Sequence, residues 1–483
     1  ASLRVMGLSE PDAGGGAAVD VEAIREDFPI LEREFGGEQL VYLDNAATSQ
    51  TPEPVVEAIA HYYRHTNANV HRGLHQLSQE ASIAYEEAHD RVADFIGAEG
   101  REEVVFTKNT TESMNTVAYA WGLAELGPGD EIVMTEMEHH AALVTWQQIA
   151  KKTGAEVKFI RVDDEGYLDM DHARELVTDD TEMVSAVHVS NTLGTVNPVG
   201  DLADLAHDHD ALCFIDGAQS VPHMPVDVGD IDADFFAFSG HKMCGPTGIG
   251  VLYGKEHLLE EMQPYLYGGM MISKVTFEDS TWHELPWKFE AGTPPICQGI
   301  ALAEACDYLD DIGMENIDRH GRELAAYAHD RLSEMGDVDI YGPPADDRAG
   351  DLHLCMGVTA VEGQDGDVVV TRPRVRHLSH VPDGVGPGEG RRTAGQRHDV
   401  RRRVRIRAGF RRAPLLEHTP SRERRRLSRY ASGGSNHQGP ARRNPLSLPL
   451  RCWLALTCGA GVSTDPCWTT SPARATRWAV TGR

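Results

Sequence analysis

The stretch Phe238-Ser-Gly-His-Lys242-Met-Cys-Gly-Pro-Thr-Gly-Ile-Gly250 follows a short apolar segment and places a lysine in a glycine-rich turn. A lysine flanked by Gly, Ser and His at the end of a strand suits Schiff-base formation with an aldehyde cofactor. The side chains of Ser239 and His241 can hydrogen-bond a phosphate group of that cofactor. Taken alone, the stretch is as typical of a surface lysine in a glycine-rich loop, so its interpretation depends on the neighbouring strand ends.

A carboxylate ends another apolar segment 26 residues earlier, in Ile215-Asp216-Gly-Ala-Gln219. Pyridoxal phosphate needs a carboxylate against its pyridinium nitrogen, because the protonated ring draws electrons from the Cα atom of the substrate. An aspartate at a strand end more often caps a turn. Together with Lys242, however, Asp216 favours a site for this cofactor.

Working outward from these two strand ends, short apolar segments alternate with amphipathic ones up to about Gly350, which is typical of a parallel α/β sheet. Strands are expected at Val104–Thr107, Ile132–Thr135, Val157–Val162, Met183–Val189, Leu212–Ile215, Phe235–Phe238 and Gly250–Tyr253. Helices are expected at Ser78–Ile96, Glu112–Leu126, Ile296–Ile312 and Glu315–Met335. Gly97 suits the left-handed cap of the first of these helices.

The charge is distributed very unevenly along the 483 residues. Residues 1–360 carry 66 Asp and Glu against 21 Lys and Arg, a net charge of −45. Such an acidic, lysine-poor part is typical of halophiles, whose surface carboxylates keep a protein hydrated in concentrated salt. The eight cysteines show no paired spacing, which favours a reducing cytoplasm. No apolar run approaches a membrane span or a signal peptide, so neither an integral membrane protein nor a secreted protein is expected.

Residues 361–483 carry 24 Arg, no Lys and 9 acids, and after about Gly357 no helical or strand periodicity remains. A basic tail that binds nucleic acid and a disordered linker are two interpretations. Out-of-frame translation of a GC-rich gene is the favoured one, with its junction between Asp347 and Arg372. The expected organisation is a flexible extension (1–20), a large domain (21–295), the start of a smaller C-terminal α/β domain (296–357) and an anomalous, disordered tail (358–483).

Several motifs together resemble those of the fold-type I pyridoxal phosphate enzymes, and within them the SufS-like (group II) cysteine desulfurases of the class V aminotransferase family. The likeness runs from about Val21 to about Gly350. It is carried by the Lys242 and Asp216 motifs and by Val41-Tyr-Leu-Asp-Asn-Ala-Ala-Thr48, Val70-His-Arg-Gly73, Asn109-Thr-Thr-Glu112, Glu138-His-His-Ala141, Val189-Ser-Asn-Thr-Leu-Gly-Thr195 and Phe289-Glu-Ala-Gly-Thr293.

The resemblance implies a large domain with a mainly parallel seven-stranded sheet flanked by helices, a smaller C-terminal α/β domain that is disrupted here, and a site for pyridoxal phosphate. Lys242 corresponds to the lysine that binds the cofactor and shuttles the Cα proton. Asp216 corresponds to the partner of the pyridinium, and His139 to the imidazole stacked on the ring. The pair His139-His140 could alternatively indicate a metal site, but no third ligand lies at helical spacing.

The resemblance also assigns the remaining groups around the cofactor. Thr110 and Thr111 precede a helix whose N-terminus suits a phosphate. Donors to the 3′-oxygen are Asn191 and Gln219. Thr293 would reach the phosphate in the other subunit of a homodimer. The substrate pocket would contain Asn45 and His71.

The implied activity converts L-cysteine to L-alanine and an enzyme persulfide, which supplies sulfur to an acceptor protein of iron–sulfur cluster assembly. It requires a loop of the Arg-x-Gly-His-His-Cys kind and an arginine that clamps the substrate carboxylate. Ile406-Arg-Ala-Gly409 and Pro414-Leu-Leu-Glu-His418 are only remnants of such a loop, and no cysteine lies between Cys355 and Cys452. The alternatives are a selenocysteine lyase, a kynureninase-like enzyme, an aminotransferase, or a non-catalytic cofactor-binding protein with a basic tail.

Overall fold

The computed structural model describes residues 19–334, 340–349, 359–362 and 368–371, all within one compact unit that comprises residues 1–408. The expected extension is therefore described only from Val19 onward. The loop remnants and nearly all of the expected tail lie outside the described residues, as does most of the segment with the predicted junction. Their assignments stay predictions.

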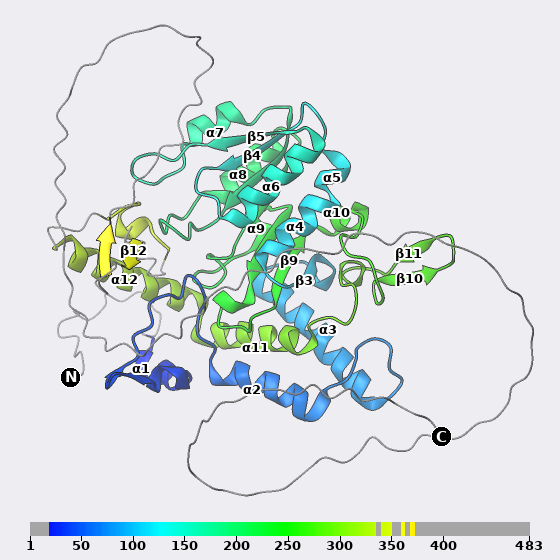
Figure 1. The fold of residues 1–483 in the computed structure, drawn as a ribbon, viewed down its shortest axis with the longest axis horizontal. Helices are drawn as coiled ribbons and strands as arrows, with labels where there is room; N and C mark the ends of the chain where they lie inside the picture. Colours follow the sequence, from blue (N-terminus) through cyan, green and yellow to red (C-terminus); the bar gives the residue numbers. More distant parts are fainter. Residues whose placement is uncertain (1–18, 335–339, 350–358, 363–367, 372–483) are drawn as a thin grey trace, which may run out of the picture. The chain divides into compact units, whose positions relative to one another are not determined.

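A seven-stranded sheet forms the centre of the unit (Figure 1). Its order is β3-β9-β8-β7-β6-β4-β5, and β9 runs antiparallel to both of its neighbours while the other pairs are parallel. This confirms the expected mainly parallel sheet. Its strands are β3 (Val104–Thr107), β4 (Glu131–Thr135), β5 (Glu156–Ile160), β6 (Thr181–Val187), β7 (Leu212–Asp216), β8 (Phe235–Ser239) and β9 (Gly250–Gly254).

Two strand predictions ran too far. β5 ends at Ile160 and β6 at Val187, because Val162 and Val189 leave the sheet and form isolated antiparallel bridges with Leu168 and Val196. Three two-stranded antiparallel ribbons lie outside the main sheet: β1 (Glu34–Phe35) with β2 (Glu38–Gln39), β10 (Ile272–Val275) with β11 (Ser280–Trp282), and β12 (Thr359–Glu362) with β13 (Val368–Thr371).

Helices connect the strands. The α-helices are α1 (Val21–Glu26), α2 (Glu53–His61), α3 (Gln76–Ile96), α4 (Thr110–Ala120), α5 (Gly122–Glu125), α6 (His140–Thr153), α7 (Met170–Leu176), α8 (Val199–His207), α9 (Val228–Ile231), α10 (Glu256–Glu261), α11 (Ile296–Ile312) and α12 (Met314–Ser333). Short 3-10 or π turns are η1 (Pro29–Glu32), η2 (Tyr62–Thr66), η3 (Arg101–Glu103), η4 (Gly240–Lys242), η5 (Trp287–Phe289) and η6 (Ala345–Asp347).

Some helix ends differ from the expected bounds, because side-chain contacts decide them and the apolar periodicity does not. α3 begins two residues before the expected Ser78, because the His75 ring accepts a hydrogen bond from the Ser78 amide. It ends at Gly97 with φ +71°, as expected. The helix expected from Glu112 to Leu126 is wrong in its start and in its continuity. In the structure the helical segment begins at Thr110 and divides into α4 and α5 at Trp121.

The sheet is buried on both faces, since alternate residues of a strand point to opposite layers. One layer packs Val133, Ile215 and Phe236 against α3, α8 and α11. The other packs Ile132, Phe214 and Phe235 against α4 and α6. α3 and α11 lie side by side (Figure 1). No helix among the described residues is long and apolar enough to cross a membrane.

We expect the midpoint of thermal unfolding to rise with KCl concentration. The net charge of −45 on residues 1–360 repels itself most strongly at low salt, where the Debye length is about 30 Å at 0.01 M and about 3 Å at 1 M. A gain of about 1 kcal/mol would move the midpoint by about 2–4 °C. Differential scanning fluorimetry across a KCl series measures this directly. An unfolding midpoint that stays constant or falls as the KCl concentration rises would contradict the halophilic interpretation.

Candidate active site

A cavity of about 530 Å³ opens beside Lys242 at the carboxyl ends of β7 and β8. Most of the predicted cofactor residues line this one cavity, although they come from distant parts of the chain. They are Thr110, Thr111, His139, Asn191, Asp216, Gln219, Ser239, His241 and Lys242. In open α/β sheets such ends are the usual place for a ligand.

The turn that carries Lys242 is tied to the segment before α2. The carbonyl oxygen of His241 accepts hydrogen bonds from Thr48 Oγ1 (2.9 Å) and from the Ser49 amide (3.0 Å). The Ser49 hydroxyl in turn accepts a hydrogen bond from the Cys244 amide (2.8 Å). These bonds hold η4 in place, so the backbone on both sides of Lys242 is fixed.

The N-terminus of α4 forms one end of the cavity. Asn109 caps the helix, because its Oδ1 accepts a hydrogen bond from the Glu112 amide (3.0 Å). Ser239 Oγ accepts the Thr110 amide (2.9 Å) and lies 2.8 Å from Thr110 Oγ1. Thr110 and Thr111 therefore belong to the first helical turn instead of preceding it. Sequence reasoning missed Asn109, although asparagine is a favoured N-cap residue.

A close backbone approach explains one glycine of the Lys242 motif. A Cβ atom on Gly250 would lie 2.5 Å from the Cα atom of Asn109. β9 could not then pass beside the helix N-terminus as it does. The glycine thus lets β9 lie close to the N-terminus of α4, which lines the cavity.

Charged groups form the other end. Asp216 is 2 % exposed, and its Oδ1 accepts a hydrogen bond from the Ala218 amide (3.0 Å). Burial raises the pKa of Asp216, and the hydrogen bond from the Ala218 amide and the charge of Lys242 oppose that rise. His139 caps α6 through Nδ1, and burial lowers its pKa, so its ring is neutral at neutral pH.

Sequence reasoning also missed a buried carboxyl beside this end. Glu138 Oε1 accepts hydrogen bonds from Thr135 Oγ1 (2.7 Å) and from the Val187 amide (2.8 Å). Val187 is the register partner of Asp216 across β6 and β7. Burial and the nearby charge of Asp216 raise the pKa of Glu138 to about 8, so this carboxyl is largely protonated at neutral pH. Nothing in the sequence pattern distinguishes it from an exposed glutamate.

Gln219 is buried, and its Nε2 donates to the carbonyl oxygen of Ala46 (2.9 Å). The amide has a second hydrogen for a ligand. Its Oε1 is buried without a hydrogen-bond partner among the described residues. Asn191 lies on the same cavity wall.

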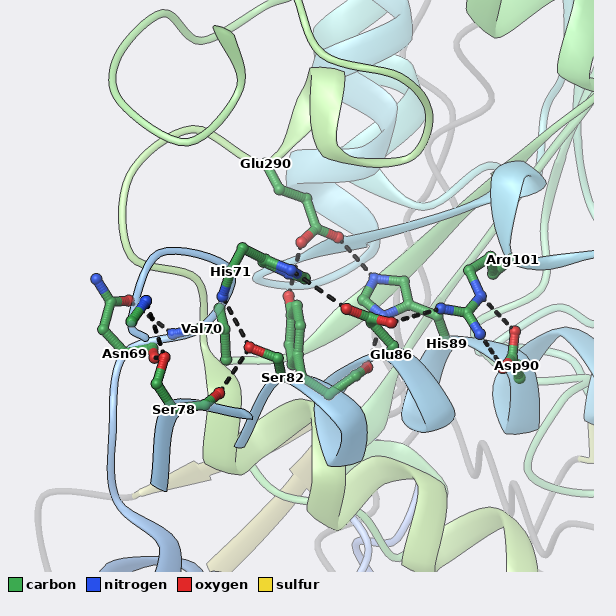
Figure 2. Close-up of polar contacts among 12 residues, drawn as sticks. Asn69, Val70, His71, Ser78, Ser82, Glu86, His89, Asp90, Arg101 and Glu290 are labelled. Atoms are coloured by element: carbon green, nitrogen blue, oxygen red, sulfur yellow. Dashed lines mark hydrogen bonds and ion pairs between the residues drawn. The ribbon is translucent and has the colours of Figure 1, made fainter. Parts of the chain in front are cut away.

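The structure does not bring every predicted site residue to this cavity. Asn45 lines an adjoining, largely apolar groove of about 570 Å³, which it shares with Lys242. His71 lies in a separate cavity with Glu86 and Trp287, where it contacts α3 (Figure 2). Thr293 is exposed and does not line the Lys242 cavity of its own chain.

Comparison with known proteins agrees with the arrangement. The model of the aminotransferase class-V family matches residues 41–372. A cysteine desulfurase from Haloferax volcanii is 72% identical over 345 residues, covering 69% of this chain and 81% of the relative. The chain belongs to the cysteine desulfurases of the class-V aminotransferase family. A probable cysteine desulfurase from Halobacterium salinarum is 70% identical, covering 68% and 80% of the two chains.

Solved structures give the same family. The apo cysteine desulfurase of Thermococcus onnurineus NA1 is 44% identical, with a TM-score of 0.66 over 69% of this chain and 82% of that one. The cysteine desulfurase CsdA of Escherichia coli is 40% identical, with a TM-score of 0.60 over 65% and 77%. The relatives from Haloferax and Halobacterium also agree with the halophilic composition.

Members of this family depend on pyridoxal phosphate, and the cavity residues fit that cofactor. A helix N-terminus with two threonines suits a phosphate dianion. A buried carboxylate suits a ring nitrogen that carries a proton, since burial of an unneutralised charge is costly. The amine of Lys242 would suit the cofactor aldehyde, and the second amide hydrogen of Gln219 would suit an oxygen of the ring.

Proposed function

We propose that the Lys242 cavity is the site at which this cysteine desulfurase holds pyridoxal phosphate. The observation that carries the proposal is the convergence of Lys242, Asp216, His139 and the α4 N-terminus on one cavity. Pyridoxal phosphate, when bound, withdraws electrons from the Cα atom of the substrate.

Each side chain has a separate task in this proposal. Lys242 is the amine that binds the cofactor aldehyde and moves the Cα proton. Asp216 keeps a proton on the ring nitrogen, and the neutral ring of His139 covers the cofactor face. The phosphate is held by Thr110, Thr111, Ser239 and His241, and the 3′-oxygen by Asn191 and Gln219.

The site is tested with the variant Asp216→Asn. Loss of a charged hydrogen-bond partner costs about 1.5–3 kcal/mol, so we expect pyridoxal phosphate to bind about 10- to 150-fold more weakly. Fluorescence titration in high salt measures the affinity. Asp230→Asn, an exposed position at the start of α9, is the matched control and keeps wild-type affinity. Equal affinity in the Asp216 variant would contradict the assignment.

We further propose that this chain retains the groups for chemistry at Cα and lacks those for sulfur abstraction. The thiolate is the nucleophile. Burial raises the pKa of Cys244 to about 12, and it also raises the pKa of Cys213 and of Cys306. Cys297 is buried and hydrogen-bonded to Tyr63 (3.2 Å). None of these four described cysteines is suited to attack the substrate sulfur.

The family match supports a frame change as the origin of this loss. It ends at residue 372, the distal limit of the predicted junction, and 111 further residues follow that are rich in arginine. The arginine clamp and the persulfide cysteine of the family would then be encoded in another frame. Arg407 is the one local candidate for the loop arginine, and it lies outside the described residues.

The intended substrate in this proposal is L-cysteine, and the sulfur passes to an acceptor protein of iron–sulfur cluster assembly. Thr293 supports a homodimer with shared sites, because it is exposed and apart from the Lys242 cavity of its own chain. A cytoplasmic location is supported by the four described cysteines, which are all free thiols. The net charge of −45 on residues 1–360 does not suit a nucleic acid as partner.

A further inference from the structure

One face of α3 carries a row of polar side chains that hold two separate segments (Figure 2). On one side, Ser78 Oγ accepts the Gly73 amide (3.0 Å), and Ser82 Oγ accepts the His71 amide (2.8 Å). On the other side, Tyr85 and His89 bind Glu290, which is about 200 positions away in the sequence.

The carboxyl group of Glu290 receives three hydrogen bonds inside the protein. Oε2 accepts the Tyr85 hydroxyl (2.7 Å), and Oε1 accepts the Phe106 amide (2.9 Å) and lies 2.9 Å from His89 Nε2. Tyr85 and His89 are fully buried, and Glu290 is 7 % exposed. Both oxygens of this buried carboxyl group are therefore held by hydrogen bonds from separate parts of the chain.

The contacts of His89 hold its ring on both sides. Its Nδ1 lies 2.9 Å from the carbonyl oxygen of Tyr85, and its Nε2 lies 2.9 Å from Glu290 Oε1. His89 and Glu290 therefore form a buried hydrogen-bonded pair, in which loss of one partner would leave the other unsatisfied.

The buried pair of His89 and Glu290 lies close in the sequence to an exposed residue. Thr293 follows Glu290 by three positions and is exposed. Between them, Gly292 adopts φ +89°, and its amide donates to the carbonyl oxygen of Gly269 (2.8 Å). The short turn is thus anchored at Glu290 and at Gly269, which restricts where Thr293 can lie.

We propose that Glu290, held by Tyr85 and His89, is a positioning residue that fixes the Gly292–Thr293 turn for the cofactor site of a second copy of the chain. This inference rests on the proposed function, in which Thr293 serves the other subunit. Glu290 does not line the Lys242 cavity, so it acts only through the turn. The contacts with Tyr85, His89 and Phe106 keep the carboxyl group from moving, because movement would leave buried polar groups unpaired.

The first test compares Glu290→Gln with Asp90→Asn by titration with pyridoxal phosphate. Asp90 is a matched control: it is a half-exposed carboxylate on α3 that pairs with Arg101. We expect Glu290→Gln to stay folded by circular dichroism and to bind the cofactor at least about tenfold more weakly, while the control keeps wild-type affinity. Unchanged affinity in Glu290→Gln would overturn the proposal.

Tyr85→Phe is measured alongside, because it removes one donor and keeps the ring packing. We expect a smaller loss of affinity in the same direction. If Glu290→Gln does not fold and Tyr85→Phe binds as the wild type does, the network has only a structural role and the proposal is wrong. If the wild type itself takes up no cofactor at Lys242, the proposed function fails instead.

The second test distinguishes positioning across subunits from a local folding defect. Differently tagged Glu290→Gln and Lys242→Ala chains are co-expressed, and the mixed dimer is isolated. Its single intact Lys242 belongs to the Glu290 variant and receives the turn of the other chain. We expect the mixed dimer to bind pyridoxal phosphate with wild-type affinity. After fixation with borohydride, it should carry half as much cofactor per dimer as the wild type does. A mixed dimer as weak as the Glu290→Gln homodimer would overturn the proposal.

Discussion

The chain as written is expected to release no sustained sulfide from L-cysteine, whereas a frame-corrected protein turns over many times. The C–S bond breaks only when a thiolate accepts the sulfur, and the pKa values of the described thiols Cys213, Cys244 and Cys306 are raised. The proposed absence of the carboxylate clamp would add to the loss, since removal of one member of a charged pair costs about 2–5 kcal/mol.

Both proteins are assayed for sulfide with a reductant present, in high salt. The correction is designed from the encoding DNA, in which another frame beyond codon 345 should give an acidic continuation with an Arg-x-Gly-His-His-Cys loop. Stop codons throughout both alternative frames would contradict the frame change. Repeated turnover by the chain as written would show that another thiol, such as Cys244 or Cys355, accepts the sulfur.

Replacement of the lysine is expected to have the second large effect. Lys242→Ala removes the amine that binds the cofactor aldehyde, so covalent uptake of pyridoxal phosphate and its yellow absorbance should disappear completely. The phosphate end at α4 is unchanged, and weak non-covalent binding remains. Lys151→Ala, at an exposed position of α6, is the control and keeps the absorbance. A yellow Lys242→Ala protein would place the covalent bond elsewhere.

The central sheet could be predicted closely because its strands are buried on both faces. Ile132–Met134 and Leu212–Ile215 read as continuous apolar runs, which are typical of strands with parallel neighbours on both sides, as β4 and β7 have. The helix ends were harder to predict. α4 and α5 separate at Trp121, which packs edge-on against Trp146 at 6.5 Å, a contact between residues that no local pattern connects.

The cofactor cavity was predictable for a similar reason. Asp216 ends β7, and Lys242 lies in the turn directly after the neighbouring strand β8, so both residues reach the same edge of the sheet. Glu138 and Glu290 could not be found in this way. A carboxylate is usually exposed, and only contacts across the fold, from Val187 and from His89, show that these two are buried.

His71 shows the limit of inference from a motif. The motif assigns it to the substrate pocket, yet within one chain its backbone is held by Ser82 and its ring lies 4.4 Å from Trp287. Which cavity a loop residue reaches is decided by the helix that holds the loop. The residues that hold this loop belong to α3 and lie outside the motif.

The most direct test of the account is to locate the cofactor in the wild-type protein. The holoprotein is reduced with borohydride in high salt, digested, and the pyridoxyl-labelled peptide is sequenced by mass spectrometry. The account predicts a single label, on Lys242 within the Phe238–Gly250 stretch. A label on any other lysine, or a wild-type protein that takes up no pyridoxal phosphate, would contradict it.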